Sequence, residues 1–138
     1  MKRTTFMQLE YILLEYLDYP SYIKQVEEEL LNPHTVDVDE NIGGGRGSHL
    51  SNPTERIALS IVEDKRLNRI QAQQQAVDKV YQESLPKTQE IIREYYWQRP
   101  RTKTWDGVAK QVNYSRRQCH NLRNDFFDRL ADELGMMR

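Results

Sequence analysis

The stretch from residue 32 to residue 52 most constrains what this chain can fold into. It reads NPHTVDVDENIGGGRGSHLSN, holds four of the chain's six glycines and has no helical or strand periodicity. Segments of about 20 residues without periodicity are uncommon inside compact domains. We therefore expect a glycine-rich linker over 32–52 that separates an N-terminal part, 1–31, from the remainder of the chain.

Apolar residues recur at helical spacing on both sides of this linker. Residues 1–31 predict a pair of helices, the second starting near Pro20. From Pro53 to residue 85 one long helical pattern continues, and Pro86 opens a C-terminal segment, 86–138, with three shorter helices. The predicted fold class is all-α: an N-terminal helical pair, a linker, a long central helix over 53–85 and a C-terminal helix-turn-helix domain.

The net charge of −1 conceals a strong asymmetry along the chain. Residues 1–42 carry three basic and nine acidic side chains, whereas residues 87–123 carry nine basic and three acidic ones. A basic cluster within one segment is typical of nucleic-acid binding, even where the whole chain is nearly neutral. The second of these segments is therefore the predicted site of contact with a polyanion.

Composition excludes several other classes of protein. One cysteine rules out an internal disulfide framework and a cysteine-rich metal site, and the three histidines lie in unrelated segments without ligand spacing. Apolar runs are too short to span a membrane, and the N-terminus lacks the features of a signal peptide. We expect a cytoplasmic protein with no membrane association, no cofactor, no metal and no catalytic residues, and hence not an enzyme.

Residues 104–124, TWDGVAKQVNYSRRQCHNLRN, have the pattern of a helix-turn-helix. A small residue, Ala109, stands where two helices would approach, and Asn113, four residues later, tolerates the positive φ of the turn. Ser115 is suited to cap the second helix. Apolar or near-apolar residues occupy the positions that would hold the two helices together. The predicted core comprises Val108, Ala109, Val112, Tyr114, Cys119 and Leu122.

The start of the second helix would then enter the major groove of DNA. Arginine donates two hydrogen bonds to guanine, and asparagine pairs in the same way with adenine. The predicted base-reading residues are Ser115, Arg116, Arg117, His120 and Asn121, and the basic residues expected at the phosphates are Arg99, Arg101, Lys103, Lys110 and Arg123. A three-helix protein-interaction domain with a solvated basic face is the alternative interpretation.

The C-terminal pattern LP…EIIREYYW…TWDGVAKQVNYSRRQCHNL resembles the fourth region of bacterial sigma factors, which reads the promoter −35 element. The middle stretch DENIGGGRGSHLSNPTERIALSIVEDKRL resembles phage-encoded transcriptional regulators of the RinA type, relatives of the ArpU group. The similarity extends over nearly the whole chain.

This resemblance implies an activator of phage late genes, those for packaging, morphogenesis and lysis, in a bacterial host cell. It implies double-stranded promoter DNA and bacterial RNA polymerase as partners. By position, Thr104 and Trp105 would join Ser115, Arg116, Arg117, His120 and Asn121 in contacting DNA. The sequence departs from sigma-type units at Asp106-Gly107, where a glutamate is common, and this leaves the register of the phosphate contacts open.

Other interpretations of the chain remain open. The GGGRGS run lacks the lysine of a phosphate-binding P-loop, so it is either a plain linker or a segment whose Arg46 touches DNA or polymerase. The acidic N-terminal helices are either a solvated face or an element for dimerisation or polymerase contact, and a homodimer through the long helix is a further expectation. Two alternative functions are a DNA-packaging adaptor of the small-terminase kind and a polymerase-binding antiterminator.

Overall fold

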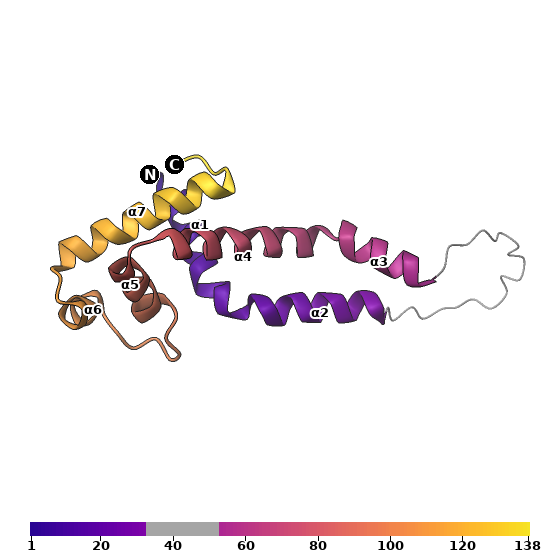
Figure 1. Ribbon diagram of the computed structural model, residues 1–138, viewed down its shortest axis with the longest axis horizontal. Coiled ribbons are helices and arrows are strands. Elements are labelled where there is room, and N and C mark those ends of the chain that lie inside the picture. The colour runs from indigo at the N-terminus through magenta and orange to yellow at the C-terminus, as the bar shows by residue number, and fades with distance from the viewer. Residues whose placement is uncertain (33–52) are drawn as a thin grey trace, which may run out of the picture. The chain divides into compact units, whose positions relative to one another are not determined.

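Helices make up the regular secondary structure of the described part of the chain. The computed structural model describes residues 1–32 and 53–138, and these ranges contain helices and no strand (Figure 1). The predicted all-α fold class is therefore confirmed. The expected linker lies outside the described residues except for Asn32. The chain divides into two compact units: one combines Met1–Tyr19 with Ala72–Arg138, and the other is Pro20–Gln71.

The first unit contains α1 (Arg3–Glu15), the 3-10 helix η1 (Tyr16–Asp18) and the end of α4 (Lys65–Glu83). It also contains α5 (Pro86–Tyr96), α6 (Trp105–Val112) and α7 (Arg116–Leu134). Pro86 suits the first turn of α5, where its missing N–H leaves no hydrogen bond unmade. α5 contacts both α6 and α7, and α1 contacts α7, so helices distant in sequence share one core. The largest fully buried residues of the first unit include Leu9, Leu13, Val77, Ile91, Ile92, Tyr96, Phe126, Phe127 and Leu130.

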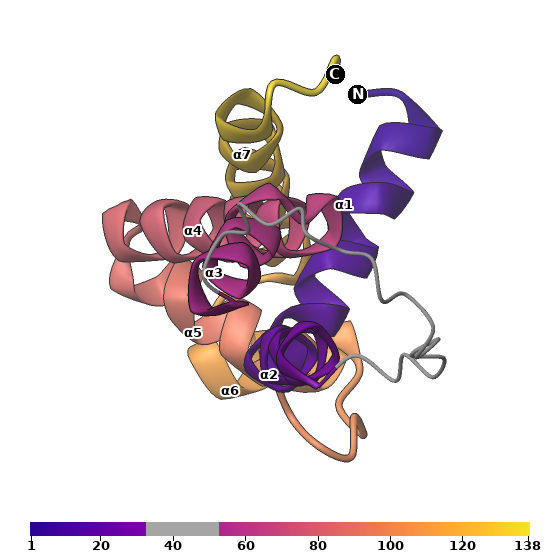
Figure 2. The same cartoon turned by 90° about the vertical axis from the view of Figure 1, so that its right-hand side faces the viewer.

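Three hydrogen bonds attach α1 to the C-terminal part of this unit. The Tyr96 hydroxyl donates to Glu10 Oε1 at 2.9 Å, and Trp97 Nε1 donates to the carbonyl of Leu13 at 3.0 Å. The Thr5 hydroxyl donates to the carbonyl of Met137 at 2.8 Å, so the start of α1 meets the residues that follow α7 (Figure 2). α1 therefore packs with the C-terminal helices, although the sequence placed it in the N-terminal segment 1–31.

The second unit contains α2 (Tyr19–Leu31) from Pro20 onward, α3 (Pro53–Glu63) and the start of α4. The single helix predicted over 53–85 is instead two helices, because α3 ends at Glu63 and α4 begins at Lys65. The residue between them, Asp64, accepts hydrogen bonds from the backbone N–H groups of Arg66 at 2.9 Å and Leu67 at 3.1 Å. A side chain that caps a new helix in this way favours a break in the pattern.

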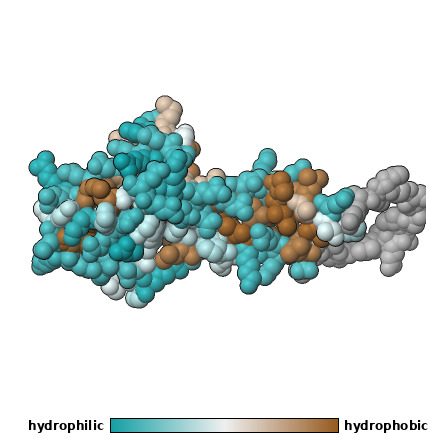
Figure 3. Space-filling view, viewed as in Figure 1, coloured by the Kyte–Doolittle hydropathy of each residue, from teal (hydrophilic) through white to brown (hydrophobic). Residues whose placement is uncertain are grey.

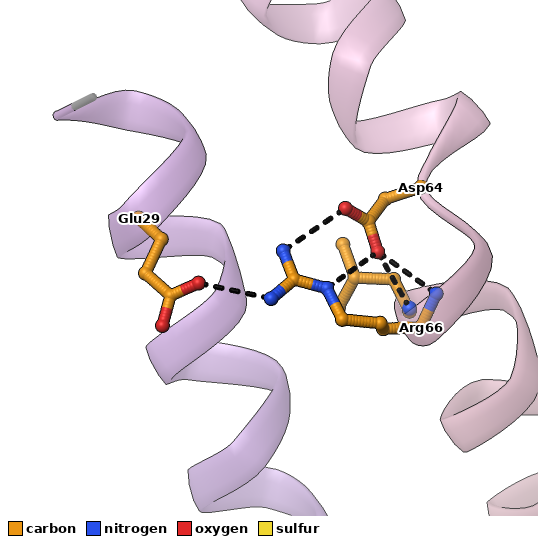
Figure 4. Close-up of polar contacts among 4 residues, drawn as sticks. Glu29, Asp64 and Arg66 are labelled. Carbon is orange, nitrogen blue, oxygen red and sulfur yellow. Dashed lines mark hydrogen bonds and ion pairs between the residues drawn. The ribbon is translucent and has the colours of Figure 1, made fainter. Parts of the chain in front are cut away.

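Arg66 joins α2 to the junction between α3 and α4. One of its guanidinium nitrogens lies 3.1 Å from Glu29 of α2, and another lies 3.1 Å from Asp64 (Figure 4). The hydrogen bond from Arg66 lowers the pKa of Asp64, as do the two backbone N–H groups that it caps. The carboxylate therefore stays ionised in its two roles, as the cap of α4 and as the partner of Arg66.

The second unit leaves apolar side chains exposed to solvent. α3 has no buried residue, and Leu59 and Val62 keep 55% and 67% of their surface exposed. Hydrophobic residues gather over α2 and α3 in the space-filling view (Figure 3). Because isolated helices shorter than about 12–15 residues are marginal in water, an 11-residue helix such as α3 needs contacts with other elements to be stable.

Candidate nucleic-acid interface

α6 begins with a side-chain cap, which Thr104 provides. The Thr104 hydroxyl accepts a hydrogen bond from the Gly107 N–H at 3.1 Å, which satisfies one of the free donors of the first turn. α6 runs unbroken from Trp105 to Val112, so Gly107 lies inside the helix and does not delay its start. The departure at Asp106-Gly107 from the sigma-type pattern thus leaves the helix intact.

Replacing Gly107 with alanine is expected to raise the free energy of unfolding by about 0.5–1 kcal/mol, because alanine has the higher helix propensity. An added Cβ would meet Thr104 Oγ1 at 3.5 Å, which is an ordinary van der Waals contact. Gly135→Ala is the matched control, since the φ of Gly135 is 69° and alanine is strained there. Urea unfolding of both variants checks this, and a loss of stability in Gly107→Ala would contradict it.

The turn between α6 and α7 has the geometry that the sequence predicted. Asn113 ends α6 with φ 65° and ψ 35°, in the left-handed region that asparagine tolerates. Ser115 then starts α7 through a capping box: its hydroxyl accepts from the Gln118 N–H at 3.1 Å, and its own N–H donates to Gln118 Oε1 at 2.7 Å. These local contacts fix where each of the two helices ends and begins.

The predicted helix-turn-helix core residues pack together. Four of them are buried in one apolar cluster with Ile91 of α5, and the other two lie half-buried against it. Ala109 retains 7% of its surface, and its small side chain permits the close approach of the two helices. Burial raises the pKa of the Cys119 thiol, which agrees with a packing role for this residue. The buried four are Val108, Ala109, Val112 and Cys119, and the half-buried two are Tyr114 and Leu122.

Lys87 of α5 supports the turn, and the sequence analysis did not single it out. Its Nζ donates a hydrogen bond to the carbonyl of Val112 at 2.8 Å and lies 5.4 Å from the centre of the Tyr114 ring. A cation at the C-terminal end of a helix satisfies a free carbonyl and favours the helix dipole. Helical periodicity gave no signal for this contact, because it joins residues 25 positions apart.

Four of the predicted DNA-contacting residues share the exposed surface at the end of α6 and the start of α7. Lys110, Arg116, Arg117 and Asn121 are all exposed. Arg117 and Asn121 are four residues apart on α7 and so lie on one face of that helix. Ser115 is also exposed there, although its hydroxyl is engaged in the cap. Together these side chains place hydrogen-bond donors and positive charge around the first two turns of α7.

Trp105 and His120 are placed differently from the expected DNA contacts. The Trp105 ring is half-buried and stacks on Tyr95 with a centroid distance of 3.9 Å. The His120 ring meets Trp105 edge-on at 4.9 Å, and its Nε2 is covered and has no hydrogen-bond partner among the described residues. Both rings therefore contribute to packing between α5, α6 and α7, and His120 does not present Nε2 to a ligand.

Arg123 also differs from the expected phosphate contact. Its guanidinium lies 4.8 Å from the centre of the Phe6 ring, 5.1 Å from that of Trp105 and 6.0 Å from that of Phe127. Cation–π contacts of this kind hold a charged side chain against aromatic faces. Arg123 is thus a link between α1, α6 and α7, which its position in the sequence did not reveal.

The basic residues between α5 and α6 have partners inside the first unit. Arg99 forms an ion pair with Asp18 at 2.9 Å, and Arg101 donates to the carbonyl of Tyr95 at 3.2 Å. Lys103 pairs with Glu94, and this contact lowers the pKa of the Glu94 carboxyl. All three basic side chains nevertheless lie on exposed residues, where a charge still acts on an approaching polyanion.

Most of this chain matches known protein sequences. Residues 9–132 match the family described as Protein of unknown function (DUF722). The chain is also 30% identical over 138 residues to the transcriptional activator rinA of Staphylococcus phage phi11, an alignment that covers 98% of this chain and 94% of that protein. The chain belongs to the RinA-type family of phage regulators. No solved structure matches it.

In this RinA-type chain, α7 starts with basic residues, and its acidic residues lie in its second half. Arg116 and Arg117 open the helix, whereas Asp125, Asp128, Asp132 and Glu133 come later.

The described ranges hold no group of three or more acidic, cysteine or histidine residues arranged to bind a metal. Within the same ranges, no helix has the length and hydrophobicity that crossing a membrane requires.

The free energy of unfolding of this RinA-type chain is expected to fall as the pH drops through the range in which histidine titrates. Burial lowers the pKa of His120, and the nearby Arg123 and Arg116 lower it further. The unfolded chain therefore binds a proton more readily, so the stability present above the unperturbed pKa of about 6.5 is lost below it. Urea midpoints measured between about pH 8 and pH 5 check this.

The matched control for the pH series is His120→Gln, which cannot take up the proton. This variant should lose the part of the pH dependence that belongs to His120, while the titration of the carboxylates remains. An unchanged slope near neutral pH would show that His120 is not responsible.

Proposed function

We propose that this RinA-type protein is a sequence-specific, double-stranded DNA-binding transcription activator of phage late genes that acts with host RNA polymerase inside the bacterial cell. The single observation that carries the proposal is the exposed surface at the start of α7, where Arg116, Arg117 and Asn121 follow a capped turn. The relative from Staphylococcus phage phi11 is a transcriptional activator, which agrees with this function.

The chemistry of the exposed residues supports base recognition. In a helix-turn-helix, the first turns of the second helix enter the major groove, and the preceding helix crosses the phosphate backbone. Arg117 would pair with guanine and Asn121 with adenine, and Lys110 on α6 would meet a phosphate. Ser115 would also lie at the bases, and the further phosphate contacts would be Arg99, Arg101, Lys103 and Thr104. Trp105, His120 and Arg123 are assigned to positioning the unit, because they pack inside it.

The test is selection of bound sequences from random double-stranded DNA, followed by footprinting at several salt concentrations. We expect a defined motif, protection centred on a major groove, and a log–log salt slope of about −0.9 for each phosphate neutralised. Enrichment of no motif would contradict sequence-specific binding. Polymerase binding that persists without DNA and survives Arg117→Ala would favour the antiterminator alternative instead.

The oligomeric state distinguishes the proposed transcription activator from the remaining alternative, a DNA-packaging adaptor. Many helix-turn-helix proteins bind two half-sites as dimers, and a homodimer remains a prediction for this chain. Native mass spectrometry on the full chain is the measurement. A monomer or dimer fits a transcription activator, whereas a ring of eight or more copies would favour the packaging-adaptor function.

A further inference from the structure

An acidic residue lies beside the start of the DNA-reading helix. Asp106, in the first turn of α6, places Oδ1 3.7 Å from Nη1 of Arg116, the first residue of α7. The two side chains border one hollow between the helices, whose floor includes the small residue Ala109. The remaining residues around this hollow are Lys110, Asn113 and Tyr114.

The negative charge of Asp106 at this position opposes DNA binding. A carboxylate at the start of α6 repels the phosphates that this helix would approach, so it lowers the affinity for DNA of any sequence. Asp106 and Arg116 are largely exposed, with 69% and 61% of their side-chain surfaces accessible. An ion pair this exposed contributes little to folding stability. Any effect of the pair would therefore fall on Arg116 and on the local charge, and not on the stability of the fold.

Arginine gains specificity when its guanidinium is held in one plane. Two parallel hydrogen bonds to a guanine edge require a fixed orientation, whereas a freely rotating side chain exchanges among neighbouring phosphates. The contact with Asp106 involves one guanidinium nitrogen, Nη1 of Arg116, so the other N–H donors of the guanidinium stay available to a ligand. The arrangement thus favours base contact over phosphate contact.

We propose that Asp106 is a positioning residue that makes Arg116 a reader of one base pair and lowers the affinity for non-specific DNA. This inference rests on the proposed DNA-binding function and names a further residue that determines its specificity. Asp106 itself touches no base. It acts through the orientation of Arg116 and through its own negative charge near the phosphates.

The test is a double-mutant cycle with Asp106→Asn, Arg116→Ala and the double variant. Each full-length protein is measured on the selected site, on that site with each base pair changed in turn, and on random-sequence duplex. Asp106→Asn should reduce discrimination about two- to five-fold at the base pair that Arg116→Ala identifies. It should also tighten binding to random duplex and steepen the salt slope by about one.

The same substitution should have no further effect on discrimination in the Arg116→Ala background, since the residue through which it acts is absent. Glu94→Gln is the matched control, because Glu94 of α5 is likewise a carboxylate in an ion pair of this unit, but its partner is Lys103 and not a residue of α7. Glu94→Gln should leave discrimination at every base pair unchanged. Asp106→Glu, which keeps the charge, should retain part of the discrimination.

Three results would overturn the inference. Discrimination that is unchanged in Asp106→Asn shows that Arg116 needs no support, and a uniform loss at every base pair shows a general structural effect. A loss that persists in the Arg116→Ala background shows that Asp106 acts by another route. If the wild-type protein selects no motif, the proposed function fails together with this inference. A selected motif with any of the three results removes the inference alone.

Discussion

Phe127→Ala is expected to lower the free energy of unfolding by about 3–5 kcal/mol, the range for truncating a buried aromatic residue. Phe127 has no exposed surface, and its ring lies 4.9 Å from that of Phe6 and 6.1 Å from that of Tyr96. The substitution therefore opens a cavity where α1, α5 and α7 meet. It also removes one of the three rings around Arg123.

A loss of this size is a large part of the 5–15 kcal/mol typical of a folded domain. Urea unfolding followed by circular dichroism measures it, and we expect the variant to be partly unfolded at 37 °C. Met7→Ala is the control on the exposed side of α1, where 56% of the residue is accessible, and it should change stability by less than about 0.5 kcal/mol. Equal effects of the two substitutions would show that the packing of α1 against α7 is wrong.

The double variant Arg117→Ala/Asn121→Ala is expected to lose about 2–6 kcal/mol of specific DNA binding, as each base contact contributes about 1–3 kcal/mol. Both side chains are exposed on one face of α7, so the fold should be unaffected. Binding to random duplex should fall far less, because only one positive charge is removed. Fluorescence anisotropy on the selected site and on random duplex gives both numbers.

Arg129→Ala is the matched control for that double variant. It removes the same charge from an exposed position on the same helix, three turns further along. We expect it to leave specific binding nearly unchanged. If Arg129→Ala weakens specific binding as much as Arg117→Ala/Asn121→Ala, the effect is one of overall charge, and the start of α7 does not read bases.

The sequence predicted the helix-turn-helix well because its signals are local. The cap at Thr104, the positive φ at Asn113 and the capping box at Ser115 each depend on residues within four positions of one another. Apolar spacing then identified the core residues, since a helix buries one face. Local propensity and packing agree in this part of the chain, which is the condition under which sequence reasoning succeeds.

The break between α3 and α4 was not predicted, although residues 63–66 (EDKR) hold no apolar side chain and so interrupt the apolar spacing. Asp64 is compatible with an exposed helical position as well as with a cap, and no proline or glycine marks the change. The pairing of Arg66 with Glu29, which accompanies the break, joins residues 37 positions apart. Contacts at that separation cannot be read from periodicity.

The contacts of individual basic residues also could not be predicted from the sequence. The sequence predicted a DNA contact for both Arg117 and Arg123, but the aromatic rings that contact Arg123 come from residues 6, 105 and 127. α1 had to be placed against α7 before this difference could be recognised. Net charge therefore located the basic segment, and tertiary packing placed one of its members, Arg123, against aromatic rings.

The surroundings of Trp105 make the helix-turn-helix optically observable. Its indole stacks on Tyr95 and meets His120 edge-on, whereas the other tryptophan, Trp97, stacks on Tyr16 near α1. In a Trp97→Phe variant the tryptophan fluorescence would come from Trp105 alone. Emission from that one indole would then follow rearrangement at the start of α7 in real time, without an attached dye.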